Sequence, residues 1–180
     1  KNASHHLDRK EALQELIGKQ EDKKVFASIV AAFDDPYYEL QVFALEQVNL
    51  SYKYSKRQVI SKIEALAKKS KNNFVKAAAI KVLGRLVYFD YQDFFEKSIE
   101  NESNKVKSSA LEGLYYLNEE KAMEKAKELP VSVKKAIAFP LAKMYFQKRE
   151  VSEMAFVAGY IIQGMYLGQN KESKQAFFHQ

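Results

Sequence analysis

A chain of 180 residues with 47% hydrophobic residues can bury a substantial core, and this excludes a disordered polypeptide. The sequence contains no cysteine, which excludes disulfide bonds and thiolate metal sites. Lysine and arginine outnumber aspartate and glutamate by 29 to 23, so the net charge is +6. The excess is concentrated in residues 53–85, where ten basic side chains stand against Glu64 alone.

Apolar residues recur at helical spacing along the whole chain, and strand-type alternation is absent over any useful length. The sequence therefore predicts an all-α fold of about nine to ten helices. In chain order, the expected helices cover residues 8–17, 22–33, 37–48, 55–69, 73–88, 91–100, 104–117, 119–129, 132–147 and 152–167.

Capping and turn residues indicate where several of these helices begin or break. Asp8 is the expected N-cap of the first helix, and Asp35 with Pro36 the expected cap and first position of the third. Ser103 is expected to cap the helix over residues 104–117. Pro140 should kink or interrupt the helix in which it lies, because proline lacks the N–H that helix bonding requires.

A short cassette recurs four times within these helices, with leading residues 35, 31 and 27 positions apart. It consists of an aliphatic residue, an amide or basic residue directly after it, a small or apolar residue four places on, and another aliphatic residue eight places on. The copies are Leu40-Gln41-Ala44-Val48, Val75-Lys76-Ala79-Leu83, Val106-Lys107-Ala110-Leu114 and Val133-Lys134-Ile137-Leu141.

The spacing of the cassette has a packing explanation. Residues four and eight apart lie on one stripe of a helix, so each copy predicts an inward-facing ridge. The polar second residue falls at the edge of that face, where it either stays in water or bonds to a neighbouring turn. One helix pair cannot bury such a face alone, so the repeat predicts a single domain over residues 1–180. Its expected architecture is an α-α superhelix of stacked antiparallel helix pairs of the HEAT/ARM type.

The residue patterns of self-contained enzymes are missing from the sequence. The three histidines, His5, His6 and His179, lie at the termini, and there is no H-E-x-x-H, glycine-rich phosphate loop or nucleophile elbow. We therefore expect this chain to have no catalytic residue, no metal ligand and no cofactor of its own.

Two stretches are candidate interaction surfaces. The helix over residues 152–167 is apolar on nearly all sides, so it is covered either by the tail after Gly168 or by another domain or a second copy. Residues 53–85, which we call the basic stretch, are either a solvated helix face or a contact for an acidic protein, anionic lipid or nucleic acid. No segment predicts a membrane span. The candidate residues are Phe156, Tyr160, Ile161 and Met165 in the helix, and Lys56, Arg57, Lys68 and Lys69 in the basic stretch.

Two segments resemble a known family. The run from Asp35 to Gln41, with Ala44, resembles the second helix of a HEAT repeat. A second likeness is carried by Leu-Asp-Arg-Lys-Glu-Ala-Leu over residues 7–13, Asp-Asp-Pro-Tyr-Tyr over residues 34–38 and Ala-Leu-Glu over residues 44–46, which resemble the C-terminal HEAT-like region of bacterial zinc aminopeptidases. These belong to the membrane alanyl aminopeptidase (gluzincin) family, whose zinc ligands and catalytic glutamate lie in a separate upstream domain. None of those positions exists in this sequence.

The resemblance implies a non-catalytic accessory domain, a C-terminal piece of a larger bacterial protein, that buttresses a peptidase domain and shapes substrate access. Zinc would then belong only to the upstream domain, and the location is left open between cytoplasm and export. The alternative is a stand-alone scaffold that binds a protein along its second helices. Nucleic-acid binding through residues 53–85 is the least favoured function.

Overall fold

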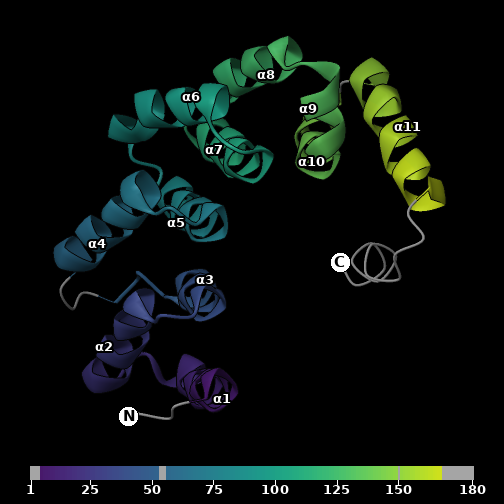
Figure 1. Cartoon of the computed structure of the whole chain (residues 1–180). Helices are drawn as coiled ribbons and strands as arrows, with labels where there is room; N and C mark the ends of the chain where they lie inside the picture. The colour runs from purple at the N-terminus through teal and green to yellow at the C-terminus, as the bar shows by residue number, and fades with distance from the viewer. Residues whose placement is uncertain (1–4, 53–55, 150, 168–180) are drawn as a thin grey trace. The chain divides into compact units, whose positions relative to one another are not determined.

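The computed structural model describes residues 5–52, 56–149 and 151–167, and these form α-helices joined by turns and short 3₁₀ segments (Figure 1). No strand occurs in these ranges, so the predicted all-α fold is confirmed. The chain divides into two compact units, Lys1–Leu117 and Asn118–Gln180, which are described separately. A superhelical array that includes the whole chain stays a prediction.

In the first unit, helix pairs stack on one another. The helix α4 packs on α5, and α6 packs on α7, as Figure 1 shows. The second helices also contact each other in the order α3, α5, α7. The bounds are α1 His6–Leu16, α2 Lys23–Ala31, α3 Tyr38–Gln47, α4 Lys56–Lys69, α5 Asn73–Arg85, α6 Gln92–Asn101 and α7 Asn104–Leu117.

In the first three copies, the apolar residues of the cassette form the buried ridge that their spacing predicts. The fourth copy does not form one ridge, because the helix breaks at Ile137 and Val133 is only half-buried. In α3, α5 and α7 the first, middle and last cassette residues are all buried, and even the most exposed, Val48, exposes only 9% of its surface. The middle residue of these three copies is Ala44, Ala79 or Ala110, and each is fully buried. A small side chain there lets the neighbouring helix approach closely, so the sequence repeat is a packing repeat.

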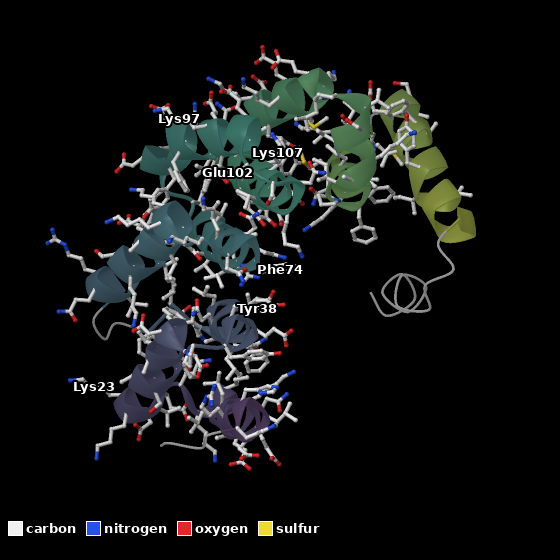
Figure 2. All side chains as sticks on the ribbon, viewed as in Figure 1. Lys23, Tyr38, Phe74, Lys97, Glu102 and Lys107 are labelled. Carbon is white, nitrogen blue, oxygen red and sulfur yellow. The ribbon has the colours of Figure 1, made fainter. Side chains whose placement is uncertain are left out.

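The polar second residue of the cassette connects helix ends. Lys107, at the start of α7, donates to the carbonyls of Ile99 (2.7 Å) and Glu100 (2.9 Å) in the last turn of α6. Lys76 in α5 instead reaches the next pair, where its Nζ lies 3.0 Å from Oε1 of Glu102. Glu102 and Lys107 are labelled in Figure 2. A cation at a helix C-terminus is favourable because the carbonyls there carry partial negative charge.

Asp35 joins the turn before α3 to α1. Arg9 binds its carboxylate through two nitrogens, at 2.8 and 2.9 Å, and the backbone N–H of Tyr37 donates to the same carboxylate at 2.8 Å. Gln41 of α3 donates to the Asp35 carbonyl at 2.6 Å. The predicted cap and first position at Asp35 and Pro36 are therefore wrong. Tyr37 is the N-cap of α3, because the Asp35 side chain is already engaged before the helix begins.

One other predicted cap is wrong and one is confirmed. The N-cap of α1 is His5, whose Nδ1 accepts from the backbone N–H of Leu7 at 3.3 Å. Asp8 lies instead in the first turn, where its charge complements the helix dipole. The predicted cap at Ser103 is confirmed, because its hydroxyl accepts from the backbone N–H of Val106 at 3.4 Å.

An aromatic contact connects neighbouring second helices near their first turns. The rings of Tyr38 in α3 and Phe74 in α5, both labelled in Figure 2, lie 5.6 Å apart between centroids. On α7, the ammonium group of Lys105 lies 4.3 Å from the centre of the Phe74 ring, within the range of a cation–π contact. The helices of three successive pairs are thus connected at one end.

Two glycines allow α5 and α7 to pack closely. A Cβ at Gly84 would lie 2.7 Å from the Cα of Gly113 on the neighbouring helix, which is closer than backbone and side-chain carbons approach. A Cβ at Gly113 would meet the ring of Phe95 at 3.0 Å. The two helices therefore pack so closely that a side chain at position 84 would force them apart.

The end of α5 is strained. Val87 has a φ of 53°, in the left-handed region that β-branched residues rarely adopt. Its N–H donates to the carbonyl of Gly84 at 3.2 Å, in a position that glycine usually occupies. The conformation costs about 1–2 kcal/mol. Tyr88 and Phe89, which follow it, are exposed.

In the second unit, Pro140 interrupts a helix as predicted, but the break falls three residues earlier. Ile137 has φ −118° and ψ 28°, outside the helical region, because the proline ring clashes with the carbonyl of Ala136 in a continuous helix. Because of this break, the described residues form eleven α-helices, one more than the predicted nine to ten. The bounds are α8 Glu119–Glu128, α9 Val131–Ala136, α10 Ala138–Lys148 and α11 Val151–Leu167.

The Arg9–Asp35 pair makes stability depend on pH. The hydrogen bond from Arg9 is the main cause that holds the pKa of the Asp35 carboxyl below its ordinary value. A carboxyl with a lowered folded-state pKa stabilises the protein above its unfolded pKa of about 4, and this contribution is lost as the pH falls towards the folded value. Asp35→Asn should therefore lower the free energy of unfolding by about 1 kcal/mol at pH 7 and by less at pH 3.

Urea denaturation at the two pH values measures this effect, and Asp34→Asn is the matched control. The Asp34 carboxylate is 68% exposed and pairs with Lys62 at the surface, so its loss should cost less than about 0.5 kcal/mol. An equal drop in stability on acidification for wild type and Asp35→Asn would contradict the role assigned to this pair.

Candidate interaction surface

The last described helix, α11, has one side that packs within the second unit. It contacts α9 and α10, and Val157 is fully buried on that side. Glu153 is the one charged residue in the sequence from Val151 to Leu167, and it is half-buried.

Among the described residues, the opposite side of α11 is exposed and carries no charged residue. Val151 is 75% exposed and Ile162 is 55% exposed, and Ala155, Ala158 and Gly159 between them are exposed too. Positions 151, 155, 158 and 162 follow helical spacing, so they form one stripe along the helix. We call these five residues the α11 stripe. An apolar helix face that is exposed from position 151 to position 162 is typical of a contact surface.

Gly159 has no packing reason within the described part of the chain. No atom there lies within 4 Å of the position its Cβ would take, and its φ is not positive. Glycine inside a helix costs about 0.5–1 kcal/mol relative to alanine. Gly84 and Gly113 offset that cost by the close packing of α5 and α7, and Gly159 would offset it in the same way if another helix packed on the stripe.

The candidate residues predicted in this helix lie partly inside the unit. The rings of Phe156 and Tyr160 meet edge to face, 4.7 Å apart. Two lysines of α9 lie beside them, Lys134 at 5.9 Å from the Phe156 ring centre and Lys135 at 4.9 Å from that of Tyr160. Ile161 is half-buried. The side chain of Met165 lies outside the described residues.

The exposed apolar side of α11 therefore differs from the side on which most of the predicted residues lie. Among Phe156, Tyr160 and Ile161, Phe156 is the most exposed, at 39%, and it borders the stripe rather than occupying its centre. The predicted set does not include Val151, Ala155, Ala158, Gly159 or Ile162. The sequence gives no clear signal for them, because by the usual pattern the one charged residue, Glu153, would mark the solvent side of the helix, and it lies on the side away from the stripe.

A second apolar strip lies on α10. Phe139 is 48% exposed and Phe146 is 69% exposed, and a spacing of seven residues places both on the same side of the helix. Lys143 lies between them. Val131 of α9 is 51% exposed as well, so the described part of the second unit exposes large apolar side chains on three of its helices.

The basic stretch of the first unit is divided by ion pairs. Arg57, Lys68 and Lys69 are exposed on α4, and Lys68 also lies 5.9 Å from the centre of the Phe94 ring. The side chain of Lys56 lies outside the described residues. Two lysines of the stretch instead bind acidic residues of neighbouring elements: Lys62 binds Asp34, and Lys76 binds Glu102. The stretch is therefore not one continuous row of free cations.

Two negative findings concern the described residues alone. Within residues 5–52, 56–149 and 151–167, no three histidine, aspartate or glutamate side chains gather as metal ligands do. No helix in these ranges is long and apolar enough to cross a membrane.

Comparison of the chain with protein-family models, with curated proteins and with solved structures gives no match.

Proposed function

We propose that this chain is a non-catalytic helical-repeat accessory domain that holds a partner protein domain against the α11 stripe. The observation that carries the proposal is the solvent-facing side of α11, which is apolar from Val151 to Ile162 and free of charge. A helix that faces only water normally carries charged residues on that side.

The size of the stripe favours a partner that is held nearby. Burial of a large aliphatic side chain is worth about 1.5–3 kcal/mol, and the stripe offers two such side chains, Val151 and Ile162. Association of two free proteins costs at least about 4 kcal/mol in lost freedom of motion. The contact therefore suits a domain kept at high effective concentration, as a covalently linked domain is.

The partner class comes from the resemblance to bacterial zinc aminopeptidases, whose catalytic domain would bring its own zinc. The segments that carry this resemblance meet in the structure, because Arg9 of one binds Asp35 of the other. Their residues thus have packing roles, which supports a shared helical-repeat fold. The peptidase domain as partner is the part of the proposal that experiment has to establish.

Photo-crosslinking from the stripe tests both parts of the proposal. A benzophenone amino acid replaces Ala158 in the natural host, and the matched control carries it at Ala65, an exposed alanine of α4. We expect position 158 to crosslink to a zinc-peptidase domain with H-E-x-x-H, in the same polypeptide or in a separate one, and mass spectrometry of the crosslinked peptides identifies that domain. An adduct with another protein would reject the peptidase assignment, and equal yields from both positions would reject docking on the stripe.

A negative charge in the stripe should prevent binding of the partner and leave the chain folded. Ala158→Glu should change the free energy of unfolding of the isolated chain by less than about 0.5 kcal/mol, because the residue is exposed. The same substitution should abolish the crosslink from a benzophenone at Ala155, because it would bury an unpaired carboxylate. Ala65→Glu is the control and should leave the crosslink intact.

A further inference from the structure

A hollow in the first unit lies between the C-terminal ends of α3 and α5. Its volume is about 460 Å³, within the range of sites that bind small ligands or peptide side chains. Four of the residues that line it are aliphatic: Val48, Leu50, Val82 and Leu86. Val48 and Val82 are buried, so the floor of the hollow is a part of the core that reaches the surface.

The remaining residues around the hollow provide hydrogen-bond donors. They are the guanidinium of Arg85, the hydroxyls of Tyr88 and Ser51, and the amide of Asn49. The Asn49 side-chain oxygen accepts from the backbone N–H of Ser51 at 2.9 Å, which leaves its NH₂ group free to donate. Among the described residues, the Arg85 guanidinium and the Tyr88 hydroxyl have no hydrogen-bond or ion-pair partner. No acidic residue lines the hollow.

The position of Tyr88 is fixed by its neighbours. It follows Val87, whose left-handed backbone sets the direction in which the chain leaves α5. Its ring stacks on that of Tyr91 with centroids 6.0 Å apart. Tyr91 is buried, and its hydroxyl donates to Oε1 of Glu64 at 2.6 Å. Strain retained next to a set of free donors is the arrangement expected at a binding site.

We propose that this hollow binds a peptide segment of a partner in which an acidic residue lies next to an aliphatic one. The carboxylate would accept from Arg85 and Tyr88, and the aliphatic side chain would cover the floor. Lys81, exposed one turn before Arg85 on the same helix, adds to the positive charge. A peptide fits better than a small free acid because Val87 and Phe89, on either side of Tyr88 in the sequence, are exposed apolar residues, Phe89 by 71% of its surface.

Binding can be measured by NMR titration of the isotope-labelled chain with the peptide N-acetyl-Leu-Glu-Leu-amide. The matched probe is the same peptide with glutamine, which keeps the shape and removes the charge. We expect the glutamate peptide to shift the backbone signals of Asn49, Ser51 and Arg85, and to bind roughly tenfold more tightly or better. The free acid 4-methylpentanoate, which carries both groups without a peptide, should bind more weakly than the peptide.

Two variants test whether the preference for the glutamate peptide comes from the hollow. Arg85→Gln should remove the tenfold preference for glutamate, whereas Lys81→Gln, on the same exposed side of α5, should reduce it no more than about twofold. Both residues are exposed, so both variants should remain folded. Equal binding of the two peptides, or tighter binding of 4-methylpentanoate, would overturn the proposal. Because this site lies in the first unit, the result is independent of docking on the α11 stripe.

Discussion

Gly84→Ala should lower the free energy of unfolding by about 2 kcal/mol, although alanine is the better helix former. The added methyl group would lie 2.7 Å from the Cα of Gly113, and a backbone atom cannot move aside as a side chain can. The helices α5 and α7 would have to separate, which would disturb the packing of consecutive repeats. The loss should therefore exceed the gain of about 1 kcal/mol in helix propensity.

The same substitution at Gly159 is the matched control, and its expected effect has the opposite sign. No described atom lies within 4 Å of the new methyl group, so Gly159→Ala should stabilise the isolated chain by about 0.5–1 kcal/mol. Urea denaturation of the two variants and the wild type measures both values. Destabilisation of the same size at both glycines would contradict the close packing of α5 on α7.

Phe95→Ala should cost about 3–5 kcal/mol, the largest single effect that we expect. The ring is fully buried in α6, and it lies where a Cβ at Gly113 of α7 would come within 3.0 Å of it. Removing it leaves a cavity between two helices that pack on each other.

Gly113→Ala provides a second test of the same contact. In the wild type this change should destabilise by about 1–2 kcal/mol, because the buried ring has little room to move. In the Phe95→Ala background the methyl group enters the cavity, so the change should become neutral or stabilising. The double-mutant cycle compares the four unfolding free energies. Additive effects would show that the two residues do not pack as the structure places them.

The repeat that positions α3, α5 and α7 could be predicted because it depends on a local pattern. Burial of an aliphatic residue, an alanine and another aliphatic residue follows from helical spacing alone. The helix ends were less predictable because tertiary contacts decided them. Asp35 resembles a cap in sequence, yet its carboxylate binds Arg9, 26 residues away, and the helix begins later. Pro140 was correctly expected to break its helix, but the clash falls one turn upstream.

The residues that the sequence favours as a contact surface and the exposed stripe lie on different sides of the same helix. Phe156 and Tyr160 are large and apolar, so composition favoured them, whereas the lysines of α9 lie against their rings in the fold. The exposed stripe consists mostly of small residues, which carry little signal in a single sequence. The donor-lined hollow could not be predicted at all, because Asn49 and Arg85 come together only when α3 packs on α5.

The claim that a partner covers the α11 stripe can be tested most directly by thiol labelling, since the sequence contains no cysteine. Ala158→Cys and the control Ala65→Cys each introduce one thiol at an exposed helix position. In the purified chain, a maleimide should label both at similar rates. In the natural host, we predict that labelling at position 158 becomes at least tenfold slower than at position 65. Equal labelling rates in the host would contradict a covered stripe.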